Sequence, residues 1–437
     1  MTRFYYTALF FVISSLCFAQ NQSYWTSKKD KIVIPFQFSN NLIVIDVLLN
    51  NTQLKMIVDS GANKNVLFSS KNFDSLQLKN VSKIKISGLG NQKPVDAFVS
   101  ENNSIKIKEF EDNQFTMVTI NENDFSLFSK FGFEVNGIIG YSFFKNNQVK
   151  IDYQSKKITI YKQLKKISRN FEKYKLSIFN EIPYLEVKTT ANNKQKNLKL
   201  LLDTGLSDGL WLFETTNLAP QQTTINDFLG FGISGETFGK RARLQQIAFS
   251  KFDFKNIIVT YPDSIFLDNI FFSKNANGIL GTEILKRFTL IIDYPNKQVY
   301  FDKNSFYNDP FNYNMSGLDI RHGKQEIFEE RINLSKQRSI KALFEKSFDN
   351  VSPQKVAYKI TLKPALEIAY VRENSPAFFA NLKVGDKILS VNNTKSYYLT
   401  LQKINQIFQS QDQKKIKLEV ERSGKIIKVT FKLKKIL

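Results

Sequence analysis

Histidine and cysteine are almost absent from this sequence, which restricts the sites it can build. His322 is the only histidine and Cys17 the only cysteine among 437 residues. Two histidine ligands for zinc are therefore not available, and a Ser-His-Asp triad would have to use His322. No G-x-S-x-G segment marks a nucleophilic serine. We expect no metal site, and any catalytic site should rest on other residue types.

Long apolar runs are also scarce, and the one at the N-terminus has the features of an export signal. Arg3 precedes the apolar segment YYTALFFVISSL, and Cys17-Phe18-Ala19 ends it with a small residue. The run is short for a bilayer span of about 20 residues. We expect residues 1–19 to be a signal peptide, which leaves no disulfide and no transmembrane segment in the mature chain. The protein should then be exported to the periplasm, the cell envelope or the medium.

Acidic residues are too few to balance the basic ones. Lysine and arginine number 62 against 40 aspartates and glutamates, for a formal charge of +22. The basic residues are scattered along the chain and are not gathered into a nucleic-acid module. We expect a solvated basic surface and no nucleic-acid partner.

What the sequence does contain is an internal repeat. LKMIVDSGANKNVLF at 54–68 and LKLLLDTGLSDGLWLF at 198–213 share one order of apolar residues, aspartate, hydroxyl residue and glycine. Further on, GIIGYSFFKNNQVKIDYQSKKITIY matches GILGTEILKRFTLIIDYPNKQVYF. The β-branched runs and the Asn-rich and Pro-Asn turns predict strands and hairpins. Two homologous, mostly β lobes are therefore predicted.

The spacing inside the two halves agrees. Asp59 precedes Gly140 by 81 positions, and Asp203 precedes Gly281 by 78. The repeat ends near Phe301, where the composition changes. The predicted parts of the mature chain are a first lobe at 20–165, a second lobe at 166–305, and a third domain at 306–437.

The aspartates of the repeat have a chemical use if the lobes pack with two-fold pseudosymmetry. A buried, unpaired carboxylate is unfavourable, and glycine allows a tight turn with a partner backbone close by. Such packing would bring Asp59 and Asp203 face to face, where two carboxylates cannot both ionise easily and share a proton. A shared proton and a water held between them supply a general acid and a general base.

These motifs resemble those of aspartic proteases with two retropepsin-like lobes. The matching runs are Asp59-Ser60-Gly61-Ala62, Asp203-Thr204-Gly205, Ile138-Ile139-Gly140 and Ile279-Leu280-Gly281. The resemblance implies a mainly β fold with two acid-protease barrels. It also implies that Asp59 and Asp203 activate water to attack a peptide carbonyl. Ser60, Gly61, Thr204 and Gly205 would support the catalytic loops, and no metal or organic cofactor would be needed.

Two positions depart from the family pattern. Many members have serine or threonine directly after the glycine, where this chain has Ala62 and Leu206. Fewer donors to the carboxylates favour their protonated forms, so we expect a pH optimum less acidic than that of gastric enzymes. The alternative function is a catalytically inactive, protease-like peptide-binding protein of the cell envelope. A structural protein with two accidental turns is disfavoured by the matched spacing.

The family covers its cleft with a flap, and one candidate lies in each half. SGLGNQ at 87–92 resembles a glycine-rich flap tip and supplies Gly88, Leu89 and Gly90. GFGISGETFG at 230–239 holds the matching place in the second half. An ordinary hairpin turn is the alternative for each segment.

The C-terminal part resembles a bacterial PDZ domain, which is an α+β fold. Ser375-Pro376-Ala377 and the run from Gly385 to Asn392 carry the resemblance, although Asn381 replaces the usual glycine before Leu382. PDZ domains bind an extended peptide as an added strand, often by its C-terminal carboxylate. The resemblance thus implies docking of polypeptide substrates or C-terminal peptides, or simple packing against the lobes.

The peptide-binding loop of this domain is predicted at Gly317, Leu318, Asp319 and Ile320. Its strand is expected to continue to about Arg321. An insertion then follows, near 324–360, before the next core strand. Within it, LSKQRSIKALFEKSF at 334–348 predicts a helix.

Overall fold

The fold was analysed in a computed structural model of the chain. It describes residues 24–25, 28–69, 76–90, 94–121, 135–164, 166–191, 194–213, 223–232, 234–249, 251–267, 272, 275–333 and 356–437. The expected signal peptide at 1–19 and the predicted helix at 334–348 lie outside the described residues.

The protein is mainly β, as the repeat predicts. The N-terminal part forms one sheet and contributes three strands to a second. Its elements are β1 (Tyr24–Trp25), β2 (Lys31–Pro35), β3 (Gln37–Ser39), β4 (Leu42–Leu49), β5 (Thr52–Val58), β6 (Val66–Ser69), β7 (Ser82–Ile86), β8 (Val95–Ile107), β9 (Phe110–Asn121), β10 (Gly137–Ile139), α3 (Tyr141–Phe144), β11 (Gln148–Asp152) and β12 (Lys157–Tyr161).

Alternation of apolar and polar residues explains these strands. In β2, Ile32 and Ile34 are buried and their neighbours are exposed, which is the pattern of a half-buried strand. Strands β4 and β5 form a hairpin around Asn50 and Asn51, whose φ angles are 45° and 68°. Asparagine tolerates this left-handed backbone better than other side chains do, and the predicted Asn-rich turn therefore forms.

The middle of the chain repeats the architecture. Its elements are β13 (Glu172–Phe179), β14 (Ile182–Ala191), β15 (Lys194–Leu202), β16 (Leu210–Leu212), β17 (Thr224–Gly232), β18 (Gly235–Phe249), β19 (Phe252–Pro262), η4 (Ser264–Phe266), β20 (Gly278–Leu280), α4 (Thr282–Leu285), β21 (Phe288–Asp293) and β22 (Gln298–Lys303).

One sheet joins the two halves. Its strand order runs β13-β22-β21-β11-β12-β2, so the hairpin β11–β12 lies against the hairpin β21–β22. At the junction Val149 of β11 pairs with Ile292 of β21. Both side chains are fully buried, in a core that spans the two halves. The halves are therefore held together by backbone hydrogen bonds and apolar packing, and the lobe boundaries remain a prediction.

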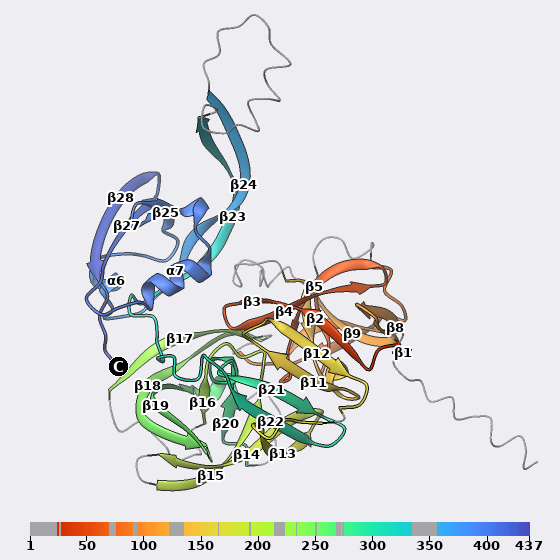
Figure 1. The fold of residues 1–437 in the computed structure, drawn as a ribbon. Coiled ribbons are helices and arrows are strands. Elements are labelled where there is room, and N and C mark those ends of the chain that lie inside the picture. Colours follow the sequence, from red (N-terminus) through yellow and green to blue (C-terminus); the bar gives the residue numbers. More distant parts are fainter. Residues whose placement is uncertain are drawn as a thin grey trace, which may run out of the picture.

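The C-terminal domain has its own sheet and its own apolar core. In Figure 1 it stands to one side of the two lobes, next to β17. Its elements are β23 (Leu318–Asn333), β24 (Val356–Val371), α6 (Pro376–Phe379), β25 (Lys387–Val391), β26 (Thr394–Lys395), η6 (Ser396–Tyr398), α7 (Leu401–Phe408), β27 (Lys415–Arg422) and β28 (Lys425–Lys432).

Strand β23 is longer than the sequence predicts. It was expected to end near Arg321 but continues to Asn333, paired with β24 and interrupted by a bulge between His322 and Gln325. The start of the predicted insertion is thus an arm of two paired strands, which projects away from the lobes in Figure 1. In this arm polar residues are interspersed with Ile327, Leu362 and other apolar residues. Pairing with β24 stabilises the extension of β23 to Asn333.

The segment between the second lobe and β23 packs closely on the protein. The guanidinium of Arg287 is fully buried, lies 3.7 Å from the ring centroid of Phe311 and donates to the carbonyls of Phe306 and Tyr307. Tyr313 belongs to the core of the C-terminal domain. The domain is therefore fixed to the second lobe. Among the described residues, no helix is long and apolar enough to cross a membrane.

Candidate active site

Each half of the repeat delivers its aspartate at the end of a buried strand. Strand β10 runs parallel to β5 and antiparallel to β6, and β20 does the same between β15 and β16. The backbone N–H of Asp59 donates to the Ile139 carbonyl at 2.9 Å, and that of Asp203 to the Leu280 carbonyl at 3.0 Å. Both aspartates are thus held at the point where three strands meet.

The hydroxyl residues next to the aspartates connect the two halves. The Ser60 hydroxyl donates to the Leu202 carbonyl at 2.7 Å and accepts the Thr204 N–H at 3.1 Å. In return, the Thr204 hydroxyl donates to the Val58 carbonyl at 2.8 Å and accepts the Ser60 N–H at 3.0 Å. Both side chains are fully buried. This reciprocal set of four bonds fixes the loop that carries Asp59 against the loop that carries Asp203.

The glycines after the hydroxyl residues allow the loops to approach. A Cβ on Gly61 would lie 2.5 Å from Cγ of Asp203, and one on Gly205 would lie 2.3 Å from Cγ of Asp59. Any larger residue would collide with the opposite carboxylate. The sequence motif therefore requires glycine because each carboxylate lies against the backbone of the other loop.

The two carboxyl groups lie in direct contact. The side chains of Asp59 and Asp203 are hydrogen-bonded to each other, and their role in catalysis remains a prediction. Burial, then the charge of Asp203 and that hydrogen bond, raise the pKa of Asp59 well above its usual value. Burial also raises the pKa of Asp203, although the bond from Asp59 favours its ionised form. When one proton has been lost, the pair therefore holds the remaining proton between its two carboxyl groups, because two adjacent buried carboxylates do not both ionise easily.

Backbone groups supply the donors that hydroxyls supply in many family members. The N–H of Gly61 donates to Asp59 Oδ1 at 2.7 Å. The N–H groups of Gly205 and Leu206 donate to Asp203 Oδ1 at 2.7 and 3.0 Å. The Leu206 side chain packs on the apolar cluster around Trp211, so it does not separate the carboxyl groups.

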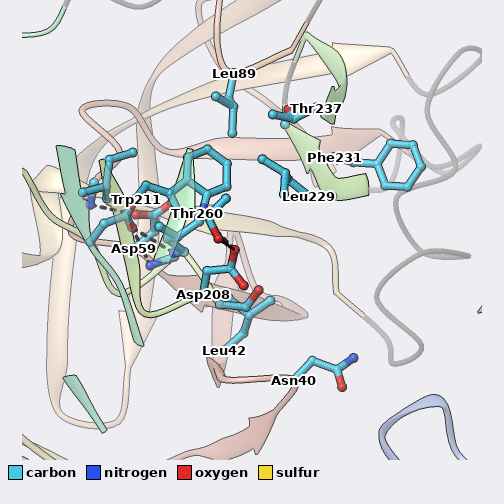
Figure 2. Close-up of a pocket in the computed structure, with 18 of the residues that line it drawn as sticks. Asn40, Leu42, Asp59, Leu89, Asp208, Trp211, Leu229, Phe231, Thr237 and Thr260 are labelled. Carbon is cyan, nitrogen blue, oxygen red and sulfur yellow. Dashed lines mark hydrogen bonds between the residues drawn. The ribbon is translucent and has the colours of Figure 1, made fainter. Parts of the chain in front are cut away.

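A cavity of about 850 Å³ opens above the carboxyl pair. Two hairpins cover it: the first flap hairpin (β7–β8, with its tip at 87–90) and the second flap hairpin (β17–β18, with Gly232 and Ser234 at its tip). Figure 2 shows Leu89 and Leu229 facing the cavity on the side opposite Asp208. Residues 91–93 and 233 of the tips are outside the described ranges.

The tips of the two hairpins meet. Gly88 N–H donates to the Ser234 hydroxyl at 3.0 Å, and Ser234 N–H donates to the Leu89 carbonyl at 2.9 Å. A Cβ on Gly90, whose φ is +132°, would lie 2.3 Å from the Ser234 carbonyl carbon. The predicted flap residues Gly88, Leu89 and Gly90 are therefore brought against the second tip, over the cavity. Their role in covering a substrate remains a prediction.

A network of charged side chains links the second catalytic loop to the C-terminal domain. Asp208, five residues after Asp203, accepts from Arg241 at 2.9 Å. Arg241 lies on β18 and also donates to Asp227 of β17 at 2.9 Å. Arg372, beyond β24, reaches the other oxygen of Asp227 at 3.4 Å. The four side chains are mostly buried, so one ionic chain joins loop, flap hairpin and C-terminal domain.

The predicted peptide-binding loop lies in the wall of the same cavity. Gly317, Leu318 and Asp319 line it, while the Ile320 side chain is buried in the domain core. Gly317 has φ +83°, and a Cβ there would lie 2.2 Å from Cβ of Ser375. The loop is thus locked against the turn before α6. The structure places it beside the second flap hairpin, a proximity that no local sequence pattern indicates.

Sequence reasoning missed two groups of residues. Arg241 ends the segment GETFGKR, whose spacing does not fit a phosphate loop, and its partners are distant in sequence. Asn65 accepts from the Gly140 N–H at 3.0 Å in the first half, and in the second half the Gly209 carbonyl takes this role for Gly281 at 2.8 Å. Comparing the halves position by position would have revealed Asn65, because the replacement is glycine.

Comparisons with known families agree with this geometry. Residues 45–143 match the aspartyl protease family, and residues 367–422 match the PDZ domain. No curated protein matches the chain. The chain therefore contains a retropepsin-like aspartyl protease domain and a C-terminal PDZ domain.

Proposed function

We propose that the protein is an aspartic endopeptidase that hydrolyses peptide bonds with water activated between Asp59 and Asp203. The observation that carries the proposal is the contact of these two carboxyl groups at the floor of a covered cavity. Asp203, as the carboxylate, accepts a proton from water while the water oxygen attacks the scissile carbonyl carbon. Asp59, as the acid, donates its proton to the carbonyl oxygen. Asp203 then donates the proton it took from water to the amide nitrogen, the carbon–nitrogen bond breaks, and one hydroxyl of the diol returns its proton to Asp59, which leaves a carboxylic acid and an amine as products.

The surroundings support this division of roles. Backbone N–H groups bond to both carboxyl groups, the hydrogen bond from Asp59 favours the ionised form of Asp203, and burial keeps one proton on the pair. The apolar walls, which include Trp211 and Leu89, limit the access of bulk water. We further propose that the PDZ domain docks polypeptides and that residues 1–19 direct the protein to the cell envelope or beyond.

Digestion of a denatured protein substrate tests the proposal. Purified wild type is compared with Asp59→Asn and Asp203→Asn, and Asp412→Asn at an exposed turn is the matched control. We expect cleavage by wild type and the control, and a loss of at least about a thousandfold in both dyad variants, since the pair acts as one unit. Equal digestion by all four proteins refutes the mechanism. Binding without cleavage by wild type identifies a peptide-binding protein instead.

A further inference from the structure

The cavity above the carboxyl pair extends to the PDZ domain. The same continuous cavity is lined by Leu318 and Asp319 of β23 and by Asn405 and Gln409 at α7. These residues border the groove between the strand and the helix of the PDZ domain. A chain that lies in the cavity can therefore reach both the carboxyl pair and this groove.

The groove offers an open strand edge. Within the described part of the chain, β23 is the outermost strand of its sheet and pairs only with β24. Its other edge faces the groove beside α7. An extended polypeptide can add to such an edge by backbone hydrogen bonds, which do not depend on its sequence.

The loop at the start of β23 is poorly suited to a terminal carboxylate. Two of its N–H groups already have acceptors: Gly317 donates to Asn314 Oδ1 at 3.2 Å, and Leu318 donates to Ser316 Oγ at 3.1 Å. The Asp319 carboxyl group lines the cavity at the same loop, and in its ionised form its charge would repel an incoming carboxylate.

Asp319 also stands out among the charged groups of the groove. Asp227 is paired with Arg241 and Arg372, and Arg321 lies 3.6 Å from Glu367. Among the residues that the structure describes, Asp319 has no cationic partner. Burial, and then the nearby Asp227, raise the pKa of Asp319 to about 7, while the Ile320 N–H lowers it. A cation placed here would offset the unfavourable burial of its charge.

We propose that this groove binds an internal, extended segment of the substrate, with a lysine or arginine side chain against Asp319. Another part of the same substrate chain then lies under the flap hairpins at Asp59 and Asp203. The inference rests on the proposed peptidase function. It assigns the substrate class: long unfolded chains that carry a basic residue at a set distance from the cleaved bond.

A lysine scan of peptide substrates tests this inference. One lysine is moved along a neutral peptide that spans both sites, and kcat/KM is measured for the full-length protein with free and amidated C-termini. We expect one lysine position to raise kcat/KM about tenfold, which corresponds to about 1.4 kcal/mol and is close to the lower end for a hydrogen bond to a charged group. Amidation of the C-terminus should change kcat/KM less than about twofold, because no terminal carboxylate is bound.

Variants of the full chain assign the effect to Asp319. In Asp319→Asn the tenfold preference for the lysine peptide should disappear, whereas Asp412→Asn should retain it. A flat lysine scan, a preference that survives in Asp319→Asn, or a strong loss of activity on amidation each overturns the inference. Cleavage that continues in any of these cases leaves the peptidase proposal intact.

A binding measurement separates the two proposals if no peptide is cleaved. Fluorescence anisotropy with labelled neutral and lysine peptides is recorded for full-length Asp59→Asn, with and without Asp319→Asn. If the lysine peptide binds more tightly than the neutral peptide, and the difference disappears in Asp319→Asn, the groove assignment is supported. In that case only the peptidase proposal fails, because no peptide is cleaved. Equal binding of both peptides overturns the groove assignment as well.

Discussion

The hydroxyl of Thr204 offers a direct test of how the two halves are joined. Valine at this position keeps the shape of the side chain but removes the bond to the Val58 carbonyl and the acceptor for the Ser60 N–H. Both orphaned groups are buried, and each unsatisfied group costs about 1–3 kcal/mol. We therefore expect Thr204→Val to lower the free energy of unfolding by about 2–6 kcal/mol. For two lobes that unfold together, this corresponds to a fall of roughly 3–10 °C in the thermal midpoint.

Thr119 provides a matched control for this prediction. It is also fully buried, and its hydroxyl has no hydrogen-bond partner among the described residues. Thr119→Val should therefore change the unfolding free energy by no more than about 1 kcal/mol. Thermal unfolding followed by circular dichroism compares the two variants. If Thr204→Val is no less stable than Thr119→Val, the cross-lobe bonds do not hold the halves together. Combining Ser60→Ala with Thr204→Val should cost less than the sum of the single changes, since both act on one network.

Three further predictions concern the site. Gly205→Ala should lower kcat/KM by about a hundredfold or more, since its Cβ would lie 2.3 Å from Cγ of Asp59 and displace the carboxylate; near-normal peptide cleavage would contradict this. Ser234→Ala removes the acceptor of the Gly88 N–H at the flap tips. Because one such hydrogen bond contributes about 1 kcal/mol, we expect KM to rise roughly fivefold with little change in the thermal midpoint. An unchanged KM would argue that this contact does not close the flaps. The raised pKa of Asp59 gives stability that is fully present below the usual value of 3.8 and is lost as pH rises through the folded pKa. The thermal midpoint of wild type should thus fall relative to Asp59→Asn as the pH rises from 3.8 through the raised pKa of Asp59, whereas a constant difference would refute the shift.

Much of the site could be predicted because the two homologous halves of the chain can be compared with each other. The two Asp-hydroxyl-Gly motifs identify the turns, and the matched glycines Gly140 and Gly281 identify the strands that pass beside them. Local patterns also suffice for hairpins such as β11–β12, since alternation and turn residues are encoded within a few positions. The contact of Asp59 with Asp203 follows once the halves are assumed to pack symmetrically.

Other features depend on contacts that short-range patterns do not encode. Ser234 meets Leu89 only because two flap hairpins converge, and Asp208 meets Arg241 although 33 residues separate them in the sequence. The predicted end of β23 was wrong. Pairing with β24 extends the strand, although the polar residues of this segment do not favour a strand by themselves. The contact between the PDZ domain and the second flap hairpin likewise depends on how the segment around Phe311 packs.

We propose that Asp59 and Asp203 together hold and activate one water molecule. The most direct measurement is a crystal structure with a peptide in which a hydroxyl-bearing carbon replaces the scissile carbonyl. Such a mimic should bind tightly because it resembles the tetrahedral species that the site stabilises. The account predicts that its hydroxyl lies within hydrogen-bond distance of both carboxyl groups, beneath the two flap hairpins. A mimic bound away from the pair, or carboxyl groups too far apart to share its hydroxyl, would contradict the account.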